Sequence, residues 1–288
     1  MSSRWRLGLG LVLGLVLMAC GRTVESCVAD CIPIPSGDIS LAAQLELPPG
    51  PGPHPILVVV HGSGKVERGQ FACETSPWLE RGVGLLCYDK RGVGQSTGSY
   101  SNVGTGSSVE VFPILAGDVV AVVEYVAGRP EIDADRIGLI GGSQAGWLMP
   151  LAASLSDEID FIISISGATS SVGISDRFDA IAERGLSEEE IEADLASYEG
   201  TLGFDPRPVL EELDIPVLWL YGGRDQSNPT ANDISIIEEI VAEHGSDFTI
   251  EFFPTANHEL VDVETGTPID ALLPMLAWVN RIGVIGTG

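Results

Sequence analysis

The sequence predicts the α/β fold class, with a mostly parallel, doubly wound sheet. Continuous apolar runs occur at residues 55–61, 83–88, 136–141 and 161–166, and such runs are typical of strands buried on both faces of a parallel sheet. A stretch with helical spacing of apolar residues, 114–127, lies between the second and third runs. Because strands that alternate with helices form βαβ units, neighbouring strands are expected to run parallel.

The segments between these runs have weaker patterns. Residues 39–47 alternate apolar and polar side chains, which indicates a strand, and the prolines and glycines of 48–53 end it. A short helix is expected over 76–81. The Gly/Ser-rich stretch 97–108 shows no periodicity, so we expect a loop that overhangs a cleft.

Two further helices are expected near the C-terminus. Asn228 and Pro229 have the types favoured at a helix N-cap and first turn, and Gly245 is a helix stop. The final helix is predicted over 268–282. Its apolar residues recur at helical spacing and are expected to face the sheet: Leu272, Leu273, Leu276 and Val279.

An insertion, residues 168–208, separates two of the predicted strands. Within it, Ser187 and Glu190 have the spacing of a capping box and predict a helix that runs to about Tyr198. One side of this helix is apolar and carries Ile191, Leu195 and Tyr198. We expect this side to pack on the main domain; a second interpretation is that its edge also walls a substrate pocket.

A serine lies where a buried strand meets a helix. The predicted strand 136–141 leads into Gly141-Gly142-Ser143-Gln144-Ala145-Gly146, and a helix is expected over 144–155. Small residues on both sides allow the backbone to bend sharply and expose the hydroxyl at the bend. This is the sequence pattern of a nucleophile elbow, so Ser143 is the candidate nucleophile.

The two partners that such a serine needs follow it in the chain. Asp225 closes the apolar strand that begins at Val217, and His258 lies in the loop after the strand 248–253. A histidine base takes the serine proton, and a carboxylate fixes the tautomer of the imidazole. Asp262, just past His258, is the alternative carboxylate.

From about residue 39 onward the chain resembles the α/β-hydrolase superfamily. The resemblance rests on residues 61–64 (His-Gly-Ser-Gly), residues 88–96 (Tyr-Asp-Lys-Arg-Gly-Val-Gly-Gln-Ser), the Ser143 elbow, and the Asp225 and His258 pair. The usual elbow reads Gly-x-Ser-x-Gly, whereas the last place here is Ala145, and Gly146 follows. Alanine is small, so the turn is expected to form.

The resemblance implies further site residues. The backbone N–H of Gln144 is expected to be one oxyanion donor, and the N–H of Ser63 or Gly64 the second, with the choice left open. Arg91 is expected to brace the oxyanion loop through backbone hydrogen bonds. The insertion 168–208 lies where the superfamily carries its lid, and its length implies a small lid that favours short acyl groups.

The leading functional interpretation is a serine hydrolase that cleaves carboxylic esters of small or short acyl groups through an acyl-enzyme intermediate. A serine aminopeptidase or oligopeptidase, or a thioester or lactone hydrolase, is the alternative among enzymes. The peptidase is less favoured because we expect no propeller domain before the hydrolase and no acidic pair in the lid that is dedicated to a substrate amino terminus. An alternative of another class is a non-catalytic binding lipoprotein. No metal or organic cofactor is expected.

The charge balance bears on the partners. With 41 acidic and 15 basic residues the formal net charge is −26, and removal of Arg4 and Arg6 with the leader would make it −28. Such a balance argues against binding to nucleic acid or to anionic lipid head groups. We interpret the acidity as a solvated surface, and the expected partner is the small-molecule ester on which the hydrolase would act.

The N-terminus resembles a bacterial lipoprotein signal. Basic Arg4 and Arg6 precede an apolar stretch, 7–18, which is followed by Ala19 and Cys20. We expect residues 1–19 to be the signal peptide and Cys20 to be lipidated, although an ordinary secretory signal is the alternative. Residues 20–37 would then form a tether before the hydrolase domain, 38–288. The protein is thus expected to be exported and anchored to a bacterial membrane by lipid alone.

Four cysteines remain besides Cys20. An exported compartment permits disulfides, and four cysteines allow three pairings. Pairing Cys27 with Cys31, and Cys73 with Cys87, keeps both loops short. The alternative for Cys87, which lies in a predicted strand, is a buried free thiol.

Overall fold

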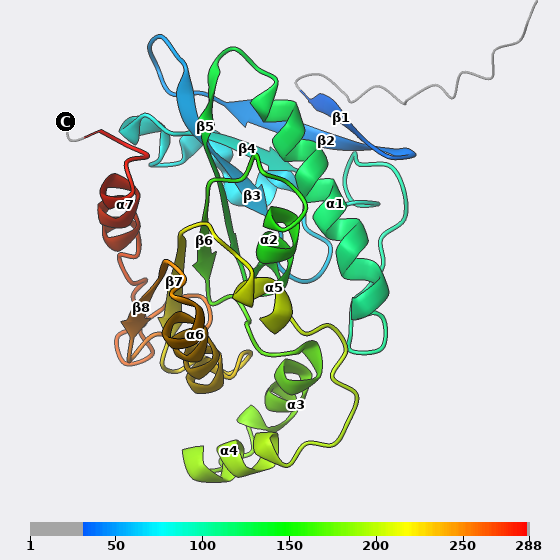
Figure 1. The fold of residues 1–288 in the computed structure, drawn as a ribbon, viewed down its shortest axis with the longest axis vertical. Helices are drawn as coiled ribbons and strands as arrows, with labels where there is room; N and C mark the ends of the chain where they lie inside the picture. Colours follow the sequence, from blue (N-terminus) through cyan, green and yellow to red (C-terminus); the bar gives the residue numbers. More distant parts are fainter. Residues whose placement is uncertain (1–30, 287–288) are drawn as a thin grey trace, which may run out of the picture.

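The computed structural model describes residues 31–286, and its centre is an eight-stranded sheet in the order β1-β2-β4-β3-β5-β6-β7-β8 (Figure 1). The strands from β4 to β8 pair in parallel, which confirms the predicted mostly parallel sheet. The strands are β1 (Ile32–Ser36), β2 (Ile39–Glu46), β3 (His54–Val60), β4 (Gly84–Tyr88), β5 (Ile132–Gly142), β6 (Phe161–Ile165), β7 (Val217–Gly222) and β8 (Phe248–Phe253).

The antiparallel edge of the sheet differs from the expectation. Residues 20–37 were expected to be a tether, but Ile32–Ser36 form β1 and pair with β2 in the sheet. Gly37, at a φ of 58°, makes the tight turn between them. β1 reads Ile-Pro-Ile-Pro-Ser, and prolines are tolerated there because only one side of an edge strand has a hydrogen-bonded neighbour.

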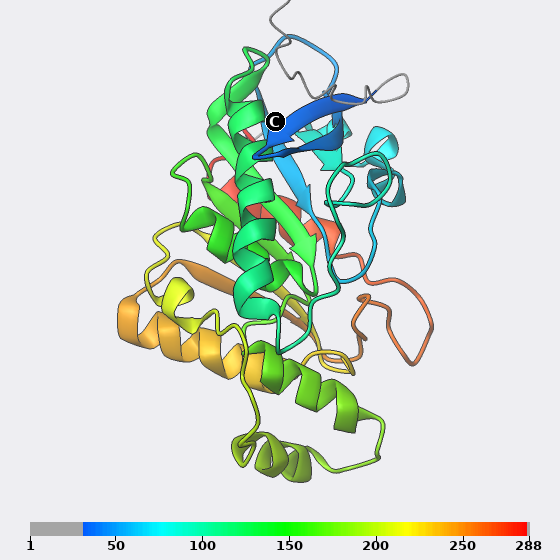
Figure 2. The same cartoon turned by 90° about the vertical axis from the view of Figure 1, so that its right-hand side faces the viewer.

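Helices cover both faces of the sheet. One face carries α1 (Ser108–Ala127), α2 (Ala145–Ala153), α5 (Arg207–Glu211) and α6 (Thr230–His244), whose apolar residues pack in one core with the strands. The other face carries α7 (Leu272–Arg281) and the short 3₁₀ turns η1 (Arg68–Phe71), η2 (Cys73–Thr75) and η3 (Leu79–Arg81). Figure 2 shows the sheet between these two layers.

Two helices depart from their expected limits. α1 begins at Ser108 rather than at residue 114, so it takes up the end of the stretch expected to be a loop. α7 begins at Leu272, and its Leu273 is 62% exposed whereas Met275 and Trp278 are buried. Leu272 and Leu276 pack against the core and Val279 is buried, so three of the four residues expected to face the sheet do so, and only Leu273 departs.

The insertion forms a small lid at one end of the sheet. Its helices α3 (Val172–Ala182) and α4 (Glu188–Ala196) protrude beyond α6 in both ribbon views (Figures 1 and 2). The capping box of Ser187 and Glu190 is present. The apolar side of α4 packs on Phe178 and Ile181 of α3, not on the main domain as expected. Tyr198 lies beyond the end of α4.

None of the helices within residues 31–286 is both long enough and apolar enough to cross a bilayer.

Candidate active site

Ser143 occupies a strained turn between β5 and α2. Its φ is 56°, a left-handed value that non-glycine residues rarely adopt. Its backbone N–H donates to the Ile165 carbonyl at 3.1 Å, which ties the turn to the neighbouring strand β6. Such strain at a single, partly exposed serine is the geometry of a nucleophile elbow.

The small residues around Ser143 are required by close backbone contacts. A Cβ on Gly142 would lie 2.8 Å from the Ile165 carbonyl oxygen, and one on Gly146 would lie 2.5 Å from the Ala168 nitrogen. The departure at Ala145 is accommodated because its methyl group is completely buried beside β5. The close approach at this turn therefore depends on Gly146.

Asp225 and His258 form the hydrogen-bonded pair that the sequence predicts. The His258 Nδ1–H donates to Asp225 Oδ2 at 2.7 Å. The second carboxylate oxygen accepts from the backbone N–H groups of Ser227 and Asn228, at 2.7 and 2.9 Å. The Asp225 side chain is 0% exposed, so a buried charge is matched by three donors and oriented toward the imidazole.

Asp262, the alternative carboxylate, serves its own loop. One of its oxygens accepts from the Thr255 hydroxyl at 2.5 Å, and the other accepts from the backbone of Glu264 and Thr265. These bonds hold the pKa of Asp262 below its usual value. Asp262 therefore closes the turn that follows His258 and makes no hydrogen bond with that residue.

The electrostatics around His258 favour its protonated form. Burial lowers the pKa of the imidazole, but the hydrogen bond and charge of Asp225 outweigh burial and raise the pKa above 6.5. The charges of Glu259 and Asp179 raise it further. His258 is thus arranged to accept a proton and to be stabilised as an imidazolium.

A cavity of about 440 Å³ joins the serine to the histidine. Ser143 and His258 both line it, and no hydrogen bond links their side chains within the described chain; such contacts often form only with substrate bound. Its remaining wall is largely apolar and consists of Val59, Val60, Gly62, Phe71, Ser76, Trp78, Leu85, Ile140, Gly141, Gly142 and Ile165. The wall opposite the sheet thus comes from the 71–78 segment, and not from Ile191 or Leu195 of the lid.

A disulfide holds this segment in place. Cys73 is bonded to Cys87 of β4, with a Cα–Cα distance of 6.5 Å, so the structure pairs them as the sequence analysis favoured. Cys87 is therefore not a free thiol. Cys31 is also disulfide-bonded, whereas Cys20 and Cys27 lie outside the described residues.

A second cavity, of about 380 Å³, adjoins the other side of His258. The lid residues Asp179 and Glu183 line it, together with Glu259 and Arg224. Three carboxylates face one guanidinium there, so the cavity favours positive charge. Asp179 of α3 and Glu183, the C-cap of that helix, lie four residues apart, a spacing that puts them on one side of the helix.

The backbone N–H groups expected in the oxyanion hole are free of internal partners. Across residues 31–286 no group accepts a hydrogen bond from the N–H of Gln144, Ser63 or Gly64. A Cβ on Gly62 would lie 3.7 Å from the Ser143 Cβ, so this loop directly adjoins the nucleophile. The geometry is that of donors held for an incoming oxygen.

The residue that braces this loop is Lys90 rather than Arg91. Lys90 Nζ donates to the carbonyls of Gly62 and Gly64, at 2.8 and 3.3 Å. Arg91 instead donates from its Nε to Asp118 Oδ2 of α1, at 2.8 Å. The expectation for Arg91 failed because the side chains of adjacent residues leave the loop in different directions, which the motif alone does not reveal.

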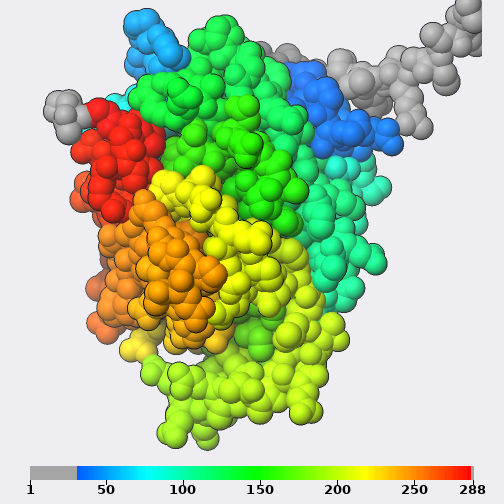
Figure 3. Space-filling view, in the orientation of Figure 1, coloured from blue at the N-terminus to red at the C-terminus, as the bar shows by residue number. Residues whose placement is uncertain are grey.

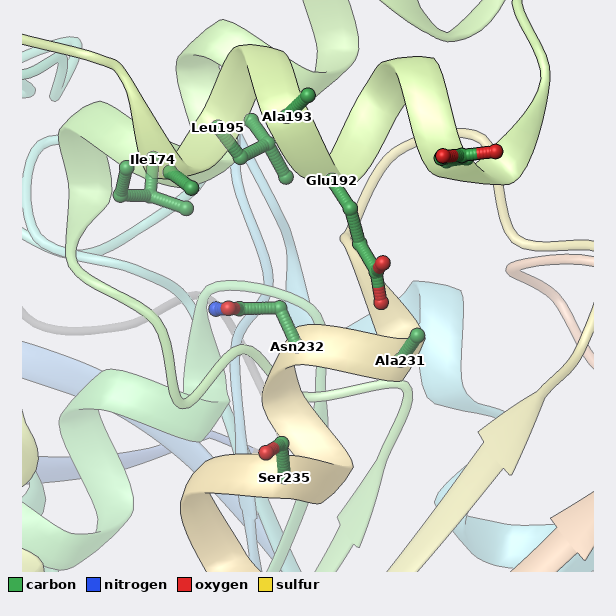
Figure 4. Close-up of a pocket in the computed structure, with 9 residues that line it drawn as sticks. Ile174, Glu192, Ala193, Leu195, Ala231, Asn232 and Ser235 are labelled. Carbon is green, nitrogen blue, oxygen red and sulfur yellow. The ribbon is translucent and has the colours of Figure 1, made fainter.

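A third cavity, of about 500 Å³, lies between the lid and α6. In Figure 3 the yellow-green lid stands off the orange α6 region, and Figure 4 shows Ile174 and Leu195 across from Asn232 and Ser235. Neither Ser143 nor His258 lines this cavity. Within the described part of the chain, no group of three or more His, Cys, Asp or Glu side chains is placed to hold a metal ion.

The fold and this arrangement define a serine hydrolase of the α/β-hydrolase type. A family model of the prolyl oligopeptidase family matches residues 70–283. This is more than half of the chain, which therefore belongs to the prolyl oligopeptidase family.

Curated relatives match over part of their length. An uncharacterised 31.7 kDa protein of Escherichia coli is 26% identical over 124 residues, which cover 43% of this chain and 41% of that protein. The 2,6-dihydropseudooxynicotine hydrolase of Paenarthrobacter nicotinovorans is 25% identical over 228 residues, which cover 75% of this chain and 54% of that enzyme. The chain thus spans about half or less of these relatives.

Solved structures share the fold. The acylaminoacyl peptidase of Pyrococcus horikoshii superposes with a TM-score of 0.63 at 18% identity, covering 90% of this chain and 42% of that one. Acetyl xylan esterase 1 of a Thermoanaerobacterium species superposes with a TM-score of 0.59 at 19% identity, covering 88% of this chain and 84% of that chain. At these identities the likeness concerns the fold alone.

Proposed function

We propose that this protein hydrolyses carboxylic esters of small or short acyl groups through an acyl-enzyme intermediate. The observation that carries the proposal is the strained Ser143 turn on the same cavity as the Asp225-oriented His258. A serine hydroxyl needs a base to become nucleophilic, and an oriented imidazole supplies one.

In this mechanism the Ser143 Oγ attacks the ester carbonyl while its proton passes to His258. The carbonyl oxygen becomes an oxyanion that accepts from the Gln144 N–H and from an N–H of the 62–64 loop. When the tetrahedral intermediate collapses, His258 gives its proton to the departing alkoxide. Water then attacks the acyl-enzyme as its proton passes to His258, and His258 returns that proton to the Ser143 Oγ as the acid leaves.

The preference for short acyl groups follows from the cavity wall. Trp78 and Leu85 are 5% and 4% exposed, so both belong to the packed core and close the cavity. Closely packed interiors resist expansion. A long acyl chain would have to displace these side chains, whereas an acetyl or butyryl group fits before them.

The test is kcat/KM with p-nitrophenyl esters from acetyl to palmitoyl, together with fluorophosphonate labelling. We expect a maximum at the short end. Ser143→Ala should lower kcat by on the order of a millionfold and abolish labelling, while Ser154→Ala, an exposed serine at the end of α2, should change neither. Near-normal turnover by Ser143→Ala, or no labelling of the unaltered protein, would favour a binding lipoprotein instead.

A second candidate, amide hydrolysis with a cationic leaving group, is favoured by the acidic cavity beside His258. His258 protonates the leaving group, so a lysine side chain on that group would reach toward Asp179 and Glu183. We would compare alanyl-lysine amide with alanyl-norleucine amide. Faster cleavage of the lysine compound, lost in Asp179→Asn/Glu183→Gln, supports this candidate; equal rates or no cleavage oppose it.

A further inference from the structure

Lys90 lies beneath the loop that adjoins Ser143, and the catalytic steps above make no use of it. Its side chain is almost completely buried, with 4% of the residue exposed. Burial lowers its pKa to about 8, so the ammonium form still dominates at neutral pH. An ammonium group offers three donors and no acceptor.

All three donors have partners, and the partners belong to both parts of the expected oxyanion hole. Lys90 Nζ donates to the Gly62 carbonyl at 2.8 Å and to the Gly64 carbonyl at 3.3 Å. It also donates to Gln144 Oε1 at 2.9 Å. The Lys90 backbone N–H adds a bond to the Val66 carbonyl at 3.1 Å. One residue therefore links the loop to the position after the nucleophile.

These bonds fix the direction of a backbone donor. In a trans peptide the C=O and the N–H point in opposite directions. Because the Gly62 carbonyl points at Lys90, the N–H of the same peptide, which belongs to Ser63, points away from Lys90. Gly62 adjoins Ser143 and lines the catalytic cavity. This orientation favours Ser63 over Gly64 as the second donor.

We propose that Lys90 is the positioning residue of the oxyanion hole. Lys90 holds the Gly62–Ser63 peptide and the Gln144 side chain, so that the backbone N–H groups of Ser63 and Gln144 converge on the substrate oxygen. This inference rests on the proposed serine hydrolase function. Lys90 acts through these two donors and need not touch the substrate.

The test compares two variants. Lys90→Met keeps the approximate side-chain length and removes the charge and the N–H donors, whereas Lys90→Arg keeps the charge and the donors. A mispositioned donor lowers transition-state stabilisation, so Lys90→Met should lower kcat about 10- to 100-fold with KM nearly unchanged. Affinity for a trifluoromethyl ketone, which forms an oxyanion on Ser143, should fall by the same factor as kcat/KM. Lys90→Arg should recover part of both.

A cycle with Gln144→Met keeps the inference testable if Lys90→Met is unstable. Gln144→Met keeps the backbone N–H but removes the Oε1 acceptor. Once Lys90 is replaced, the second change should have little further effect on kcat. Lys90 would be merely structural if turnover fell only in proportion to the loss of folded protein in every variant. In that case the affinity for the ketone per folded molecule would be unchanged. An active parent with undiminished kcat in Lys90→Met overturns this inference alone, whereas an inactive, unlabelled parent overturns the proposed function.

Discussion

At the scale of single residues, the two carboxylates near His258 have distinct surroundings. Asp225 is fully buried and bonded to the imidazole, whereas Asp262 is bonded to hydroxyl and backbone groups of its own turn. Asp225→Asn should lower kcat by roughly ten-thousandfold because an amide favours the wrong imidazole tautomer. Steady-state kinetics of both Asn variants checks this.

Asp262→Asn is the matched control and should keep activity close to that of the parent. Far-ultraviolet circular dichroism should show both variants folded. A crippling effect of Asp262→Asn together with a mild effect of Asp225→Asn would reverse the assignment.

The raised pKa of His258 predicts the acid side of the pH profile. A general base must be neutral, so kcat/KM should rise with pH through a midpoint above 6.5. The Glu259 charge contributes to the raised pKa. Glu259→Gln should therefore move the midpoint to lower pH, by roughly a few tenths of a unit, since exposed charges interact weakly. Glu264→Gln, which removes an exposed acid within the Asp262 turn, should leave the midpoint unchanged. An upward shift in Glu259→Gln would contradict the argument.

At the scale of elements, Asp233 joins α6 to the base of the lid. Its Oδ1 accepts from the backbone N–H groups of Thr169 and Ser170, at 3.1 and 2.7 Å, and the residue is 0% exposed. No group within the described chain donates to its Oδ2. Burial raises the pKa of Asp233 to about 6, although the hydrogen bonds to Oδ1 oppose the shift.

This raised pKa predicts how stability depends on pH. The unfolded carboxyl has a pKa of about 3.9, so the folded state binds the proton more tightly. The resulting stabilisation is complete below about pH 4 and is lost as pH rises through about 6. Asp233→Asn keeps Oδ1 and removes the titration. Between pH 4 and 7.5 the free energy of unfolding of the parent should fall by on the order of 2–3 kcal/mol relative to that of this variant. Urea unfolding measures this difference, and parallel pH dependences would refute the prediction.

At the scale of the whole molecule, the chain combines an acidic hydrolase with an expected lipid anchor. Cys20 lies outside the described residues, and we propose that it is lipidated. Because two or more acyl chains give stable attachment whereas one is marginal, the mature protein should partition into detergent, and Cys20→Ala should move it to the aqueous phase. Mass spectrometry of the mature N-terminus provides the check, and an unmodified terminus at another residue would exclude the anchor.

The sequence by itself determined the sheet and the candidates for chemistry. Buried parallel strands require apolar residues on both faces, so they could be read as continuous runs. Each candidate catalytic residue follows a predicted strand, and the carboxyl ends of parallel strands meet at one edge. Ser143, Asp225 and His258 could therefore be proposed together before any distance was known.

Only the tertiary structure decided which side chains meet. β1 took the place of the expected tether because the edge of the sheet accepted another strand. Lys90 rather than Arg91 reaches the oxyanion loop, and Asp179 and Glu183 of the lid reach the surroundings of His258. These contacts join residues far apart in the chain through side-chain direction and packing, and local sequence patterns carry no information about either.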